Sequence, residues 1–205
     1  MKKIRWNLGT VIQYIFLIAM AAMFVTPLLF TLISSLKDNR EIFASPFALP
    51  ETYRFENYII AWKEANMSQY FLNSVFISVA TVVILGIVAS MAAFIIARFN
   101  FKMNKFIMIF FMIGMMIPMH TILVPITYMI GTFNLKNNLF VLVLLYVGFS
   151  IPFSVMVLTN FMRGINQSLE EAAIIDGANY FQIYRHVALP LTIPAISTIS
   201  IFNFL

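Results

Sequence analysis

Residues 168–190 read SLEEAAIIDGANYFQIYRHVALP and form a polar segment between two long apolar runs. Ser168 followed three residues later by Glu171 predicts a capping box, in which the hydroxyl and the carboxylate each accept a backbone N–H at the start of a helix. Gly177 can adopt the left-handed conformation that ends a helix, and Asn179 is suited to cap a second one. The segment therefore predicts a helix, a glycine turn and a second helix held at a membrane surface.

The composition of the chain is that of an integral membrane protein. Hydrophobic residues make up 61% of its 205 residues and charged residues only 10%, whereas soluble domains carry about 25% charged residues. The mean hydropathy is +0.91. Long stretches without Asp, Glu, Lys or Arg predict five helical spans in one all-α membrane domain, residues 1–205. The spans lie at about 11–36, 72–97, 106–133, 139–161 and, incompletely, 191–205.

The same composition excludes several classes of function. There is no water-exposed basic cluster with stacking aromatic residues, so we expect no nucleic-acid binding. Cysteine is absent, which excludes disulfides, thiolate metal sites and cysteine nucleophiles. The chain has no P-loop, and no predicted span holds the acidic or basic residue that proton-coupled carriers usually place there. Energy for uphill transport is therefore expected from another subunit.

The first apolar run has two interpretations. Ala19, Ala21 and Ala22 are small residues of the kind found at the cleavage site of a secretory signal peptide. The apolar run continues well past them through Ile33, which favours an uncleaved membrane anchor. The polar stretch that follows, residues 37–68, predicts an extended segment and then a short surface helix at about 56–65, with aromatic side chains suited to a membrane interface.

Small and proline residues mark how the spans are built. In the second span, small residues recur every four positions, which predicts a close packing face: Gly86 and Ser90, and separately Ala89, Ala93 and Ala97. Prolines predict interruptions at Pro118 and Pro125 in the third span and near Pro152 in the fourth, and Pro190 marks the start of the last apolar run.

Polar side chains near these interruptions are candidates for a solute pathway. Broken helices persist at membrane depth only where protein or water satisfies the freed carbonyl groups. The alternative is a kinked, fully packed helix in which His120 bonds a backbone carbonyl. The candidate pathway residues are Asn73, Ser74, Pro118, His120, Thr121 and Asn203.

The loop at residues 164–190 resembles the cytoplasmic loop of the membrane subunits of binding-protein-dependent ABC importers. The matching residues are Glu171-Ala172-Ala173, Gly177 and Leu189-Pro190, with Val187 where that family usually has isoleucine. Flanking sequence is similar to the carbohydrate-importer branch, in particular to the second permease of maltose-type systems. The flanking residues that carry this similarity are Asn73-Ser74, Arg98-Phe99, Ile117-Pro118, Val124-Pro125-Ile126 and Ile151-Pro152-Phe153.

The resemblance implies a role for the loop and a set of partners. In that family the loop forms a coupling helix that docks into a groove of an ATPase subunit, so the expected coupling residues are Glu170, Glu171, Ala172, Ala173, Asp176, Gly177, Leu189 and Pro190. Expected partners are an ABC ATPase dimer, a second permease subunit, an extracytoplasmic solute-binding protein and membrane lipid. ATP is bound by the partner, and no cofactor is expected here. The family normally has six spans, so the chain resembles a truncated member.

The distribution of charge predicts the orientation in the membrane. With alternating spans, the N-terminal side holds eight basic residues against three acidic ones, and the other side holds five of each. All of the net charge of +5 thus falls on the side of the N-terminus and of the 164–190 loop. The positive-inside rule makes that side cytoplasmic. We expect a multi-pass protein of the bacterial cytoplasmic membrane.

The resulting hypothesis is a non-enzymatic permease subunit of an ATP-driven importer for sugars or oligosaccharides. The alternative is a secondary carrier or channel that works without ATP. A membrane enzyme is disfavoured because His120 is the one acid–base group at membrane depth. A surface loop without a protein partner is also disfavoured, since Glu170, Glu171 and Asp176 would face an anionic leaflet.

Overall fold

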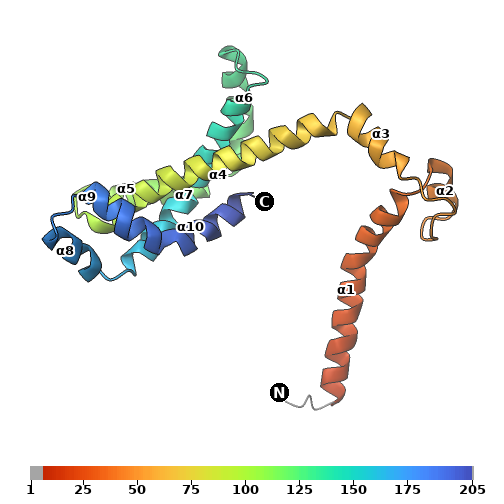
Figure 1. Cartoon of the computed structure of the whole chain (residues 1–205), viewed down its shortest axis with the longest axis horizontal. Helices are drawn as coiled ribbons and strands as arrows, with labels where there is room; N and C mark the ends of the chain where they lie inside the picture. Colours follow the sequence, from red (N-terminus) through yellow and green to blue (C-terminus); the bar gives the residue numbers. More distant parts are fainter. Residues whose placement is uncertain (1–6, 205) are drawn as a thin grey trace. The chain divides into compact units, whose positions relative to one another are not determined.

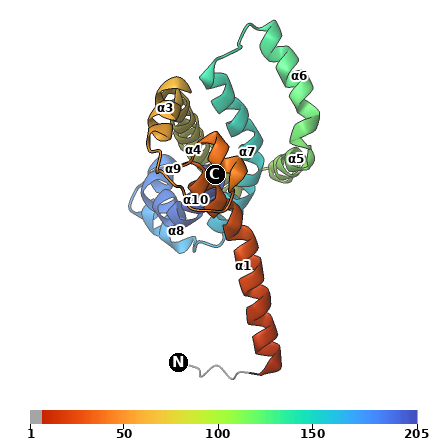
Figure 2. The same cartoon turned by 90° about the vertical axis from the view of Figure 1, so that its right-hand side faces the viewer.

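The computed structural model describes residues 7–204, which form helices and no strands (Figures 1 and 2). This confirms the all-α fold class. Within that range, four helices are long and apolar enough to cross a membrane, and a fifth candidate is a bent pair of shorter helices. The chain divides into two compact units, Met1–Tyr70 and Phe71–Leu205.

The first unit contains α1 (Leu8–Ser34), α2 (Asn39–Ala44) and α3 (Glu56–Glu64). Asn7 caps α1, since its side chain accepts a hydrogen bond from the Thr10 N–H at 2.8 Å. No residue of α1 is buried, as expected of an apolar helix whose partners are lipid or another protein. The short surface helix predicted near residues 56–65 is confirmed as α3.

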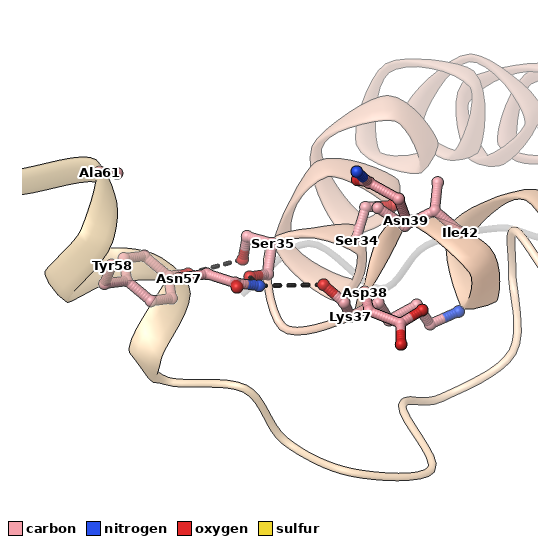
Figure 3. A pocket seen from close by; sticks show the side chains of 9 residues that line it. All are labelled: Ser34, Ser35, Lys37, Asp38, Asn39, Ile42, Asn57, Tyr58 and Ala61. Atoms are coloured by element: carbon pink, nitrogen blue, oxygen red, sulfur yellow. Dashed lines mark hydrogen bonds between the residues drawn. The ribbon is translucent and has the colours of Figure 1, made fainter. Parts of the chain in front are cut away.

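Polar side chains tie the end of α1 to α3. The Asn57 amide donates to the carbonyls of Ser35 and Lys37, each at 2.9 Å (Figure 3). These carbonyls follow the last turn of α1 and would otherwise lack a partner. Lys37 is only 2% exposed, and its ammonium donates to the Ser45 carbonyl at 2.7 Å. The result is a compact polar link beside a cavity of about 470 Å³.

Asp38 fixes the start of α2 in the same link. One of its carboxylate oxygens accepts the Glu41 N–H at 2.8 Å, and the other pairs with the Arg54 guanidinium at 3.1 Å. The Glu41 N–H first, and the positive charge of Arg54 in addition, lower the pKa of the Asp38 carboxyl below its ordinary value. The cap therefore stays ionised at neutral pH.

The second unit is a helical bundle that carries the polar loop. It contains most of α4 (Met67–Arg98), which begins in the first unit, and seven further helical segments. These are α5 (Asn104–Met116), α6 (Met119–Thr132), α7 (Leu139–Arg163), α8 (Ser168–Ile175), α9 (Tyr180–Ile183), the π-helix η1 (Tyr184–Ala188) and α10 (Leu189–Phe204).

The core of this unit joins one face of α4 to α7, η1 and α10. Ala89, Ser90 and Ala93 are fully buried, which confirms the packing face predicted from their spacing. A Cβ built at Gly86 would lie 4.0 Å from Ile196 Cγ2, so α10 approaches α4 at ordinary van der Waals distance. Small residues on this face of α4 thus leave room for side chains of α10, such as Ile196, to pack against it.

The prolines interrupt the spans less often than predicted. The chain breaks at Ile117 and Pro118, where α5 and α6 meet at an angle of 92°. Ile117 is extended, as the residue before a proline prefers. The predicted breaks at Pro125 and near Pro152 are wrong, because α6 and α7 run through them. In hydrocarbon, losing one helical hydrogen bond at a proline costs less than exposing a whole unwound turn.

Gly114 provides a test of the packing between α5 and α7. A Cβ at this position would lie 3.1 Å from Pro152 Cγ, closer than ordinary contact. Gly114→Val should therefore overpack the interface and lower the free energy of unfolding by about 1–3 kcal/mol. Thermal unfolding in detergent measures this change. Gly148→Val is the matched control, because a Cβ there has nothing within 4 Å; equal destabilisation by both substitutions would contradict the prediction.

Candidate functional site

The start of α8 differs from the prediction for the 164–190 loop. The predicted capping box at Ser168 is wrong: the residue before the helix is Gln167, which has helical backbone angles and makes no side-chain cap. Glu171 donates its N–H to the Gln167 carbonyl at 3.0 Å, while the Ser168 N–H donates to Asn166 Oδ1 at 3.1 Å. Since Gln167 is already helical, the Ser168 hydroxyl lies within the first turn rather than in front of it.

The turn between α8 and α9 follows the prediction. Gly177 has a φ of +84° and lies in the left-handed region. Its N–H donates to the Ile174 carbonyl, and the Ala178 N–H donates to the Ala173 carbonyl, each at 2.9 Å. This pair of hydrogen bonds is the Schellman motif, which satisfies the last carbonyls of a helix.

The second helix has the capping box that the first one lacks. Asn179 Oδ1 accepts the Gln182 N–H at 3.0 Å, and Gln182 Oε1 accepts the Asn179 N–H at 2.8 Å. Asn179 is therefore confirmed as the cap of α9. Gly177 and Ala178 end α8, and the next residue, Asn179, caps α9. These hydrogen bonds give the turn between the two helices a defined shape.

The passage from the loop into the last span is continuous. α9, η1 and α10 follow one another without a break from Tyr180 to Phe204, so Pro190 lies inside a helical run rather than at its entry. In η1, the Leu189 N–H donates to the Tyr184 carbonyl, five residues back. Pro190 has no N–H to donate to the His186 carbonyl, and in a regular α-helix the proline ring would clash with that carbonyl. The wider π-helical turn of η1 lies at this point of the chain.

A buried ion pair joins the loop to α4. Arg98 Nε lies 2.7 Å from Glu170 Oε1 and 2.9 Å from Oε2. The two side chains are only 6% and 10% exposed. Arg98 Nη2 also donates to the Ile165 carbonyl at 3.4 Å. The last residue of α4 thus holds both the start of the loop and the first turn of α8.

Asn104 completes the end of α4. Its amide donates to the carbonyls of Ile96 and Phe99, each at 3.0 Å. These acceptors belong to the last turn of α4 and the residue after it, where helix carbonyls have no intrahelical partner. The turn that presents Arg98 is therefore fixed from the side of α5 as well.

Aromatic side chains make a second connection between α4 and the loop. The Tyr184 hydroxyl lies 2.8 Å from Ser90 Oγ in a buried hydrogen bond. Phe94 packs against Tyr184 with ring centroids 5.4 Å apart, and Phe99 packs against Tyr180 at 4.9 Å. α9 and η1 are thus held against the same helix that Arg98 ends.

The predicted coupling residues fall on different faces of the loop. Glu171, Ala172 and Asp176 are exposed, and Gly177 is exposed at the turn. Ala173 and Leu189 pack partly against the core, while Pro190 is exposed. Glu170 faces inward to Arg98. Exposed apolar side chains accompany the outward residues, with Ile175 86% exposed, so the outer face of α8 combines acidic and apolar groups.

Sequence reasoning missed the partners that orient this face. Arg98 enters the sequence-based predictions only through the charge count and the Arg98-Phe99 similarity, and Tyr184 is given no role. The available signal was that Arg98 ends an uncharged run of 33 residues, positions 65–97, but an arginine at the end of a span can also extend its charge to the membrane interface without a protein partner. Nothing local indicates that its partner is Glu170.

The candidate pathway residues are brought together only in part. Ser74 and Asn203 line one cavity of about 330 Å³ between α4, α7 and α10, beside Ser78, Thr81, Tyr146 and Ser150. Asn203 Nδ2 donates within its own helix to the Ile199 carbonyl at 2.7 Å. Asn73 is half-buried and is not among the lining residues. Pro118, His120 and Thr121 lie exposed at the bend between α5 and α6.

Several apolar helices long enough to cross a membrane, with a polar loop of defined shape between two of them, are the features of a multi-pass membrane protein. The chain belongs to the family described as binding-protein-dependent transport system inner membrane component, whose model matches residues 83–205.

Relatives with assigned names support this membership. The diacetylchitobiose uptake system permease protein NgcG of Streptomyces coelicolor is 37% identical over 95% of this chain and 64% of its own length. The melibiose/raffinose/stachyose import permease protein MelC of Bacillus subtilis is 29% identical over 86% of this chain and 64% of its own length. The chain thus spans about two thirds of these relatives.

A solved structure has the same fold. One chain of a bacterial ABC transporter involved in the import of the acidic polysaccharide alginate matches 98% of this chain and 72% of that chain, with a TM-score of 0.85. At 21% sequence identity, this likeness concerns the fold alone.

Proposed function

We propose that the chain is a permease subunit of an ATP-driven importer for sugars or oligosaccharides. Family membership supports the transport role, and the saccharides in the names of NgcG and MelC support the class of solute. The observation that carries the proposal is the shape of the 164–190 loop. Its outer face presents Glu171, Ala172 and Asp176, while its inner face is fixed to α4.

The loop is the proposed contact with the ATPase. Glu171 contacts the partner, small Ala172 and Ala173 permit close approach, and Gly177 makes the turn. ATP, bound by the partner, closes an ATPase dimer, and the docked loops move with it. Leu189 and Pro190 pass this movement into α10, so that the spans alternate between inward and outward access.

The remaining partners follow from the same proposal. A second permease subunit completes the pathway, and an extracytoplasmic solute-binding protein delivers the solute. With a cytoplasmic N-terminus, the first span predicts residues 35–58 on the extracytoplasmic side of the membrane. Lys2, Lys3 and Arg5 lie outside the described residues. Among the described residues, the predicted cytoplasmic side still carries more basic than acidic residues, which supports this orientation.

Co-purification of the ATPase tests the proposal. An affinity-tagged chain, expressed with its genomic neighbours, should bring down an ATPase subunit, and Glu171→Lys should abolish this by reversing the charge at the contact. Glu64→Lys is the matched control, an equal charge reversal at an exposed position of the other unit. Equal recovery of the ATPase with Glu171→Lys would exclude Glu171 as the contact. Recovery of no ATPase with any of the three chains, or solute movement by the purified chain alone without ATP, would favour a secondary carrier or channel.

A further inference from the structure

We infer that the 164–190 loop drives α4 directly, and that Arg98 is the positioning residue that transmits its movement. This inference rests on the proposed function, since it assumes that an ATPase moves the loop. It adds a second route by which the loop's movement reaches the spans, beside the route through Leu189 and Pro190 into α10. The structural basis is the anchor formed by Arg98, Glu170, Ser90 and Tyr184.

The ion pair gives the anchor its strength. Arg98 and Glu170 meet at 2.7 Å with little solvent exposure, and attraction between opposite charges is stronger where water is excluded. Separating them would leave a charge buried without a partner, which is more costly than the pair itself is favourable. The ion pair therefore stays closed while the loop moves.

The second contact, between Ser90 and Tyr184, prevents the loop from rotating about the ion pair. Ser90 lies eight residues before Arg98 on α4, which is about 12 Å along a helix at 1.5 Å per residue. Its hydrogen bond to Tyr184 is buried, and Phe94, between the two contacts, packs on the Tyr184 ring. A loop held at one point can pivot, but a loop held at two points along a helix carries that helix with it.

The other end of α4 shows where the movement is delivered. Ser74, Ser78 and Thr81 lie on α4 and form one wall of the hydroxyl-lined cavity between α4, α7 and α10. The helix runs without interruption from these residues to Arg98. A displacement of the loop is thereby transferred as a rigid-body shift of that wall, in addition to the movement that passes along the chain through η1 into α10.

The first test separates coupling from assembly. In the complete transporter reconstituted in liposomes, Arg98→Gln should lower the solute taken up per ATP hydrolysed several-fold while the ATPase still co-purifies. Arg98→Lys, which keeps the charge, should restore much of the ratio. Lys102→Gln is the matched control, an exposed basic residue four positions on, and should leave the ratio unchanged. An unchanged ratio in Arg98→Gln would overturn the inference.

The second test measures the anchor itself. Because the chain has no cysteine, spin labels can be placed at Ile95→Cys on α4 and Ile174→Cys on α8, both half exposed. Their separation should be the same in nucleotide-free and ATP-trapped complexes, and should differ between them once Arg98→Gln is added. A change of separation in the chain that keeps Arg98, with the ATPase docked, would overturn the inference. Absence of ATPase docking in the chain without labels would overturn the proposed function as well.

Discussion

Arg98→Met should lower the free energy of unfolding of the second unit by about 3–5 kcal/mol, the cost of leaving one partner of a buried ion pair alone. Methionine fills much of the space of the arginine stem but leaves the Glu170 carboxylate without its two short hydrogen bonds. The first turn of α8 would then lose its tie to the end of α4.

Two comparisons identify the ion pair as the cause. Replacing both Arg98 and Glu170 by methionine should recover much of the lost stability, since well-packed apolar residues often substitute for a buried ion pair. Arg54→Met removes the exposed pair with Asp38, whose side chains are 48% and 38% exposed, and should change stability little. Thermal unfolding in detergent measures all three. The prediction fails if the double variant is as unstable as Arg98→Met.

The parts of the site that sequence reasoning predicted are those that depend on neighbouring residues. Gly177 and Asn179 each act within five residues of their own position, so glycine and asparagine in that order suffice to predict the turn. The packing face of α4 was likewise predictable, because a period of four residues is a local property of a helix.

The parts that sequence reasoning missed depend on distant residues or on competing local choices. Arg98 and Glu170 are 72 residues apart, and neither residue type indicates which charge it will meet. Two similar sequence patterns gave different results. Asn179 and Gln182 form a capping box, whereas Ser168 and Glu171 do not, because α8 begins one residue earlier than the pattern predicts. The continuity of α6 and α7 through proline reflects the membrane, where an unwound turn has no water to bind.

Gly177→Val should uncouple ATP hydrolysis from solute uptake while leaving membrane insertion intact. A β-branched residue at a φ of +84° is strained whatever the space around it, at a cost of about 1–2 kcal/mol for left-handed backbone. That cost corresponds to roughly a tenfold fall in the population of the native turn. The Ala178 and Gly177 hydrogen bonds that end α8 would be lost, and the outer face of α8 would no longer be presented in one orientation.

Gly148→Val is the matched control for this prediction. A Cβ at Gly148 or at Gly177 meets nothing within 4 Å, so the two positions differ in backbone conformation rather than in space. Gly177→Asn is the intermediate case, because asparagine tolerates the left-handed region better than valine does. Uptake and ATP hydrolysis by the reconstituted transporter should rank Gly177→Val well below Gly177→Asn in solute moved per ATP, with Gly148→Val near the unsubstituted chain. If Gly177→Val transports normally, the turn has no part in coupling, and the role proposed for the outer face of α8 must be abandoned with it.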